Sequence, residues 1–222
     1  MNTALIVGAS RGLGLGLAQE YARRGWRVIG TVRKPSPALQ KLGADVRIET
    51  LDINHAEQIA ALRQKLDGQK IDLLFVNAGI SNGSTETLAN APTDAFTTIM
   101  TTNALSPLRV IEALADLVPT EGVIAAMSSG LGSVANNTRG GWEFYRASKA
   151  SLNTLLRSFA ARRGDGRTIL AVCPGWVRTD MGGPSAALDV ETSVTGIADT
   201  IAARRGQSGS FYVDYQNREV PW

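Results

Sequence analysis

The sequence opens with an apolar run that leads straight into a glycine-rich turn, and this pairing constrains the fold more than any other feature. Residues 3–7 predict a short buried strand, and the turn Gly8-x-x-x-Gly12-x-Gly14 follows it. A helix from about Gly12 to Arg24 and a second strand over residues 26–32 complete the unit. Glycines in such a turn let the backbone approach a pyrophosphate at the N-terminus of the helix. The order strand, turn, helix, strand therefore predicts a dinucleotide-binding unit.

The composition is that of a soluble globular protein. The 222 residues suffice for one α/β domain and are few for two, so we expect residues 1–222 to form a single domain. Hydrophobic residues make up 44% and charged residues 19%, which is ordinary for a globular enzyme. The net charge of +3 is small, and the arginine pairs are scattered without interleaved aromatic residues. This pattern argues against nucleic-acid binding.

Residue counts exclude several kinds of site. The single cysteine, Cys173, excludes an internal disulfide and a cysteine-rich metal site. The single histidine, His55, excludes a His-based catalytic triad and a zinc site with several histidines, so we expect no metal. The first residues lack a basic leader, and no later apolar run is long enough to span a membrane. We therefore expect a cytoplasmic protein that does not associate with membranes.

Further strand patterns alternate with helix patterns along the rest of the chain. The expected helices include one capped by Asn54, a long one from Pro92 to about Leu117 with a kink at Pro107, and one over residues 190–204. Alternation of this kind predicts an α/β fold: a single-domain, Rossmann-like, doubly wound and mainly parallel sheet with helices on both faces. Ligands bind such sheets at the carboxyl ends of the strands. The further strands are expected at 46–51, 71–76, 122–127, 168–172 and 210–213.

The end of the second strand indicates which nicotinamide nucleotide would bind. An acidic residue at this place would hydrogen-bond the adenosine ribose of NAD, but Val32 occupies it and Arg33 follows. A guanidinium matches the oxygens of a 2′-phosphate with parallel donors, whereas a carboxylate would repel them. Arg11, inside the glycine turn, adds a second positive charge at the same end. Together they favour NADP(H) over NAD(H), although either arginine alone could be a solvated surface charge.

Tyr145 and Lys149 are separated by one helical turn and so lie on one face of a helix. An unperturbed tyrosine has a pKa of about 10, and a nearby ammonium group would favour the phenolate and lower that pKa. This predicts a tyrosine that exchanges protons with a substrate. For the pair alone, a surface helix with an incidental tyrosine and lysine is the alternative.

The ordered motifs resemble the short-chain dehydrogenases and reductases over essentially the whole chain. Five elements carry the resemblance: the glycine turn, Asp52, Asn77-Ala78-Gly79, Ser129 with Tyr145-x-x-x-Lys149, and Pro174-Gly175. The strings around Ser129, Tyr145 and Pro174 look like the small branch that contains sniffer-type carbonyl reductases and C-factor proteins.

The resemblance implies a set of cofactor contacts. Asp52 would hold the adenine amino group, with Ile53 packed on the ring. Val177 would meet the nicotinamide carboxamide, and Thr179 would lie near the pyrophosphate. The full implied set of NADP(H)-binding residues is Gly8, Ser10, Arg11, Gly12, Leu13, Gly14, Arg33, Asp52, Ile53, Asn77, Ala78, Gly79, Tyr145, Lys149, Pro174, Gly175, Val177 and Thr179.

The resemblance also implies the catalytic residues and their roles. Tyr145 would be the general acid and base, and Lys149 would hold the nicotinamide ribose. Ser129 would donate a hydrogen bond to the substrate oxygen, with Ser128 as the alternative serine. Asn103 would hold a water that links the lysine to solvent.

These residues predict an oxidoreductase that transfers hydride between NADPH and a ketone or aldehyde, or the corresponding alcohol. The alternative is an NADP(H)-binding sensor or signalling protein with little or no turnover, because a fold does not fix a function. The partner is then a small-molecule carbonyl or alcohol, and the resemblance implies a homodimer or homotetramer.

Overall fold

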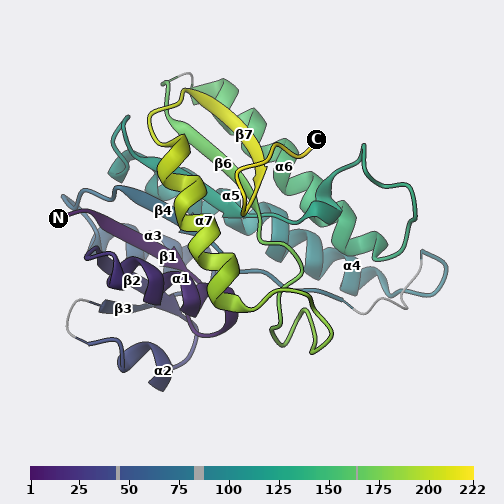
Figure 1. The fold of residues 1–222 in the computed structure, drawn as a ribbon, viewed down its shortest axis with the longest axis horizontal. Helices are drawn as coiled ribbons and strands as arrows, with labels where there is room; N and C mark the ends of the chain where they lie inside the picture. Colours follow the sequence, from purple (N-terminus) through teal and green to yellow (C-terminus); the bar gives the residue numbers. More distant parts are fainter. Residues whose placement is uncertain (44–45, 83–87, 164) are drawn as a thin grey trace.

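The computed structural model describes residues 1–43, 46–82, 88–163 and 165–222, and seven strands in these ranges form one sheet. The strand order is β3-β2-β1-β4-β5-β6-β7, and every neighbouring pair is parallel. The predicted α/β fold is therefore confirmed (Figure 1). The strands are β1 (Thr3–Val7), β2 (Arg27–Val32), β3 (Val46–Thr50), β4 (Leu73–Val76), β5 (Val123–Met127), β6 (Thr168–Cys173) and β7 (Gly209–Asp214).

Helices cover both faces of the sheet. On the face turned to the viewer in Figure 1, α1 and α7 pack together through Leu17, Tyr21 and Ile197. The other face packs on α3, α5 and α6 through residues such as Leu62, Ile111 and Leu156. Burial on both faces explains why every residue of β1, β4, β5 and β6 is buried, as unbroken apolar runs predict. The main helices are α1 (Gly12–Arg23), α3 (Ala56–Lys65), α5 (Ser106–Leu114), α6 (Glu143–Arg163) and α7 (Val190–Arg204).

The strand order reverses between β1 and β4. From β1 the chain proceeds outward to β2 and β3, and it then returns to place β4 on the other side of β1. Connections that leave neighbouring strands in opposite directions open a crevice at the carboxyl ends of those strands. The glycine turn follows β1 and Asn77 follows β4, so both lie at this crevice.

The long helix expected over residues 92–117 is broken into four parts. It consists of α4 (Thr93–Met100), a π-helical turn (Thr101–Leu105), α5 and a 3₁₀ turn (Ala115–Leu117). The irregularity is the π turn, which ends directly before Ser106 and Pro107; Pro107 has no N–H to donate to the preceding turn. A π turn of this kind often marks a functional position, and Asn103 lies within it.

One smaller expectation also differs from the structure. Asn54 does not cap α3, because His55 holds the cap position and the Asn54 side chain instead bonds Thr102 and Ser106. The segment after β2 contains a short helix, α2 (Pro37–Gln40). Within the described ranges, no helix combines the length and the apolar character that crossing a membrane requires.

Candidate active site

The glycine turn packs directly on the segment that follows β4. Gly8 has φ of 88°, and a Cβ built there would lie 2.9 Å from Ala78. A Cβ on Gly14 would lie 2.0 Å from the Gly8 carbonyl oxygen and 2.6 Å from Asn77 Nδ2. The same Nδ2 donates a hydrogen bond of 2.9 Å to Gly8 O. Only glycines fit here, so the turn, Asn77 and Ala78 form one preformed cradle.

The N-terminus of α1 lies against the loop that follows β6. Arg11 takes the cap position of α1 without a side-chain cap bond, and the first turn holds no acidic residue. A Cβ on Gly12 would lie 3.5 Å from Thr179 Cγ2, so Thr179 faces the turn, while its place near a pyrophosphate stays a prediction. Ser10 O accepts a hydrogen bond from Ser36 Oγ at 2.9 Å, and Leu13 packs against a core. Free N–H groups and the helix dipole make this end suitable for a pyrophosphate.

The two arginines predicted to select a 2′-phosphate differ in their surroundings. Arg33 is exposed after β2 and has no hydrogen bond or ion pair with any residue that the structure describes. Arg11 pairs instead with Asp180 at 2.7 Å, although both side chains are largely exposed. An exposed pair of this kind is worth little, so Arg11 can exchange Asp180 for a phosphate at small cost.

The predicted adenine contacts lie after β3. Asp52 is half-buried, and its Oδ1 accepts a hydrogen bond of 3.0 Å from Asn54 N. Ile53 is only 5% exposed and belongs to the hydrophobic core. Asp52 thus presents a carboxylate near the crevice, while most of the Ile53 surface is already covered.

Lys149 lies one turn beyond Tyr145 on α6 and is almost completely buried. Its Nζ donates a hydrogen bond of 2.8 Å to the Met127 carbonyl at the end of β5. The same Nζ lies 5.7 Å from the centre of the Tyr145 ring. A Cβ on Gly79 would lie 3.5 Å from Lys149 Nζ and 3.2 Å from Asn103 Oδ1. The small residue at 79 therefore lets α6 and the π turn meet at the crevice.

The pKa of Tyr145 shifts in the opposite direction to the one expected. Burial raises the pKa of Tyr145 to about 12, and a hydrogen bond with the Ser129 side chain opposes this rise. Burial also lowers the pKa of Lys149 to about 8. The expectation that the ammonium lowers the tyrosine pKa is therefore wrong for this structure, because desolvation of the phenol dominates. Tyr145 is a protonated phenol at neutral pH.

Asn103 is fully buried and ties three elements together. Its Oδ1 accepts a hydrogen bond of 2.8 Å from Ile80 N, and its Nδ2 donates to Ile80 O at 2.8 Å and to Ser148 Oγ at 3.0 Å. Both amide donors are thus used within the protein. The side chain fixes the segment after Gly79 against α6, while the water-holding role implied by the resemblance stays a prediction.

Ser128 and Ser129 have different partners. Ser128 is buried and its Oγ donates a hydrogen bond of 2.6 Å to Asn153 Oδ1. Ser129 is partly exposed, and its Oγ accepts a hydrogen bond from Leu131 N at 3.2 Å and lies within hydrogen-bonding reach of Tyr145. This arrangement favours Ser129 as the serine that faces a substrate.

Sequence reasoning missed two residues that hold this serine segment. Asn153 Nδ2 also donates to Gly132 O at 3.4 Å, so the one side chain binds the segment on both sides of Ser129. The Tyr212 hydroxyl donates to the Ser129 carbonyl. Asn153 could have been found as the next helical turn after Lys149, whereas no sequence signal links Tyr212 to Ser129.

The loop after β6 folds back on itself. Pro174 O accepts a hydrogen bond from Ser193 Oγ at 2.7 Å, and Gly175 has φ of 80°. Val177 is buried and pairs with Leu188, so it shows little surface toward the crevice. Among the predicted residues of this loop, all of which the structure describes, Thr179 is the one that lies against the glycine turn.

A parallel sheet with a glycine cradle at its crevice, and a tyrosine, lysine and serine beside it, defines a class of nicotinamide-nucleotide oxidoreductases. The family model described as short chain dehydrogenase matches residues 2–188, and the chain belongs to this family. It is an oxidoreductase of that family, which acts on small molecules.

Several individual proteins of known sequence or structure are similar to this chain. C-signal of Myxococcus xanthus is 39% identical over 155 residues, which cover 68% of this chain and 93% of that protein. A short-chain dehydrogenase/reductase of Burkholderia multivorans, solved with bound NADP, is 50% identical with a TM-score of 0.97 and covers 100% of this chain and 99% of its own. The carbonyl reductase Sniffer of D. melanogaster is 29% identical with a TM-score of 0.87 and covers 100% of both chains. The predicted resemblance is confirmed.

Proposed function

We propose that the chain reduces a ketone or aldehyde with NADPH, and that Tyr145 donates the proton. The observation that carries the proposal is the convergence of a protonated phenol, the Ser129 side chain and the buried Lys149 at the carboxyl ends of β4 and β5. The glycine cradle next to them suits a dinucleotide, because its glycines let the turn pack on Asn77 and Ala78 and so bring the N-terminus of α1, where a pyrophosphate would bind, to the crevice.

Each site residue would have its own role in carbonyl reduction. NADPH, when bound, supplies the hydride for the carbonyl carbon. Ser129 donates a hydrogen bond to the carbonyl oxygen, which gains negative charge in the transition state. Tyr145 transfers its phenolic proton to the same oxygen. Lys149, held by Met127 O, keeps a positive charge near the phenol. The same ammonium group would bind the nicotinamide ribose.

The ionisation state of Tyr145 matches the role of a proton donor. A phenol with a pKa of about 12 is protonated at neutral pH, and so it is ready to act as an acid. Oxidation of an alcohol would need the phenolate, which burial disfavours. The protonated phenol therefore suits the proton-donation step of carbonyl reduction at neutral pH.

The preference for NADP(H) rests on Arg33. The end of β2 carries this exposed guanidinium and no carboxylate, and the side chain is not engaged by any residue that the structure describes. Arg11 would supply a second guanidinium to the 2′-phosphate by leaving its ion pair with Asp180. The NADP bound by the Burkholderia multivorans relative supports the same assignment.

The second candidate is an NADP(H)-binding signalling protein, which the similarity to a protein named C-signal favours. The complete set of Asn103, Ser129, Tyr145 and Lys149 favours catalysis, because nucleotide binding alone does not need a proton donor.

Assembly as a homodimer or homotetramer and a cytoplasmic location stay predictions.

The test is NADPH consumption with a panel of aldehydes, ketones, quinones and diketones, with NADH in parallel. We expect turnover with at least one carbonyl class and a clear preference for NADPH. Tight NADPH binding without turnover over the panel would favour the signalling protein. Equal use of NADH would refute the role of Arg33.

A further inference from the structure

Trp142 has a backbone conformation that bulky residues avoid. Its φ is 54°, and it follows Gly140 and Gly141 with φ of 64° and 70°. Among the non-glycine residues that the structure describes, only Trp142 and Asn217 have positive φ. This region is unfavourable for an L-residue because Cβ approaches the following carbonyl oxygen, and asparagine tolerates it far better than tryptophan does. The cost of this conformation must be offset by packing of the indole, or the indole must be held there for a function.

Packing in the hydrophobic core does not provide that reason. Trp26 and Trp222 pack against the two cores, whereas Trp142 belongs to neither and is half-exposed. Its indole N–H has no hydrogen bond with the described residues, while that of Trp176 donates to Gly182 O at 2.8 Å. Strained residues that are not explained by packing cluster at ligand sites.

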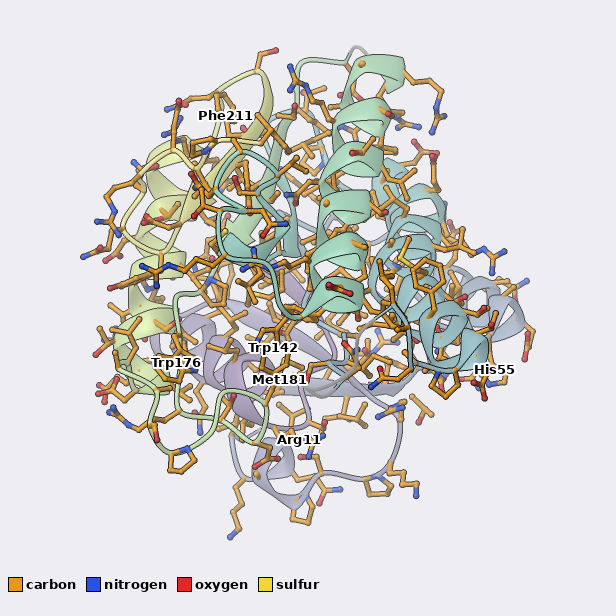
Figure 2. All side chains as sticks on the ribbon, turned by 90° about the vertical axis from the view of Figure 1, so that its right-hand side faces the viewer. Arg11, His55, Trp142, Trp176, Met181 and Phe211 are labelled. Carbon is orange, nitrogen blue, oxygen red and sulfur yellow. The ribbon has the colours of Figure 1, made fainter. Side chains whose placement is uncertain are left out.

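The conformation places the indole beside Tyr145. Arg146 N donates to Trp142 O at 2.8 Å, and Arg146 Nε donates to Gly141 O at 2.8 Å, so the first turn of α6 holds the strained segment. The Trp142 and Tyr145 ring centres are 6.4 Å apart and the planes cross at 68°. In the view of Figure 2, Trp142, Met181 and Arg11 follow one another from the start of α6 toward the glycine turn. Met181, in the loop after β6, is 48% exposed.

We infer that Trp142 determines substrate specificity and that the preferred substrates carry an aromatic ring directly beside the reacting carbonyl. The inference rests on the proposed function. The indole flanks the phenol that would donate the proton, so a group attached to the carbonyl carbon comes within reach of its face or edge. Aromatic rings favour offset or edge-to-face contacts over contacts with saturated groups of equal size. Aryl ketones and aryl aldehydes are therefore the expected class.

The test compares acetophenone with cyclohexyl methyl ketone, which has a similar size and shape but no aromatic ring. The measured quantity is the ratio of kcat/KM for the two ketones with NADPH, because intrinsic reactivity cancels when this ratio is compared between variants. Trp142→Gly should lower the ratio by about 2- to 12-fold, the range that aromatic pairs contribute. Trp142→Phe should retain most of the ratio. Asn217→Gly, the matched control at the other positive φ, should leave it unchanged.

Thermal stability separates a substrate role from a packing role. Glycine adopts positive φ without strain, so Trp142→Gly should melt at the same temperature as the original protein or higher. A packing role would instead lower the melting temperature and reduce turnover of both ketones equally, which would overturn the inference. Turnover of both ketones with an unchanged ratio would overturn the inference alone. Turnover of other carbonyls but of neither ketone would also overturn the inference alone. Failure to reduce any member of the wider carbonyl panel would overturn the proposed function and the inference with it.

Discussion

Replacement of Lys149 with Met should relieve a stability penalty that the folded protein carries at neutral pH. Lys149 is 4% exposed, and burial lowers the pKa of its ammonium group from the ordinary 10.5 to about 8. Between these two values the unfolded chain binds the proton more tightly than the folded protein does. The side chain therefore destabilises the fold below about pH 8, and the penalty disappears as the pH rises toward 10.5.

The size of the penalty follows from the two pKa values. A pKa lowered from 10.5 to about 8 corresponds to about 3 kcal/mol of unfolding free energy at pH 7. Methionine has a similar length and no charge, so it removes this penalty. It also leaves the Met127 carbonyl without its 2.8 Å hydrogen bond, which costs about 1–3 kcal/mol at every pH. At pH 7 the variant should therefore be as stable as the original protein or up to about 2 kcal/mol more stable.

Urea unfolding of both proteins between pH 7 and pH 11 measures the effect. The unfolding free energy of the original protein minus that of the variant should rise by about 3 kcal/mol across this range. Only the original protein becomes more stable as Lys149 loses its proton. Contributions from all other titrating groups cancel in the difference. A difference that does not change with pH would refute the account of Lys149 as a buried charge.

Three further predictions address the site. Ser129→Ala should lower kcat for carbonyl reduction by about 100-fold, as loss of an oxyanion donor does, whereas Ser128→Ala should mainly lower the melting temperature because it breaks the bond to Asn153. Equal kinetic losses would contradict this division. Arg33→Asp should weaken NADPH binding, measured by fluorescence titration, by at least about tenfold relative to NADH, and an unchanged ratio would refute the phosphate assignment. Gly14→Ala should abolish binding of both nucleotides, since its Cβ would lie 2.0 Å from the Gly8 carbonyl; normal binding would rule out the cradle.

Local sequence signals predicted most of the fold and the positions of most site residues. The apolar runs that became β1, β4, β5 and β6 are unbroken because both faces of the sheet are covered, which is a property that a single segment carries in its own composition. The one-turn spacing of Tyr145 and Lys149 likewise needed only the helical period.

The errors arose where distant segments decide the outcome. The π turn at Asn103 depends on bonds to Ile80 and Ser148, which lie 23 and 45 positions away. Arg11 and Asp180 are 169 positions apart, and nothing in either local pattern predicts their pairing. The pKa of Tyr145 is raised rather than lowered, because the desolvation that controls it is a property of the assembled site.

The role of Tyr145 as proton donor is the central claim, and Tyr145→Phe tests it most directly. The substitution removes one hydroxyl from a ring that otherwise keeps its place on α6. Steady-state reduction of the best carbonyl substrate should fall by about 100- to 10,000-fold, the usual contribution of a general acid. The dissociation constant for NADPH, measured by fluorescence titration on the same preparation, should change by no more than about twofold. Reduction within tenfold of the original rate, with NADPH still bound, would contradict the account.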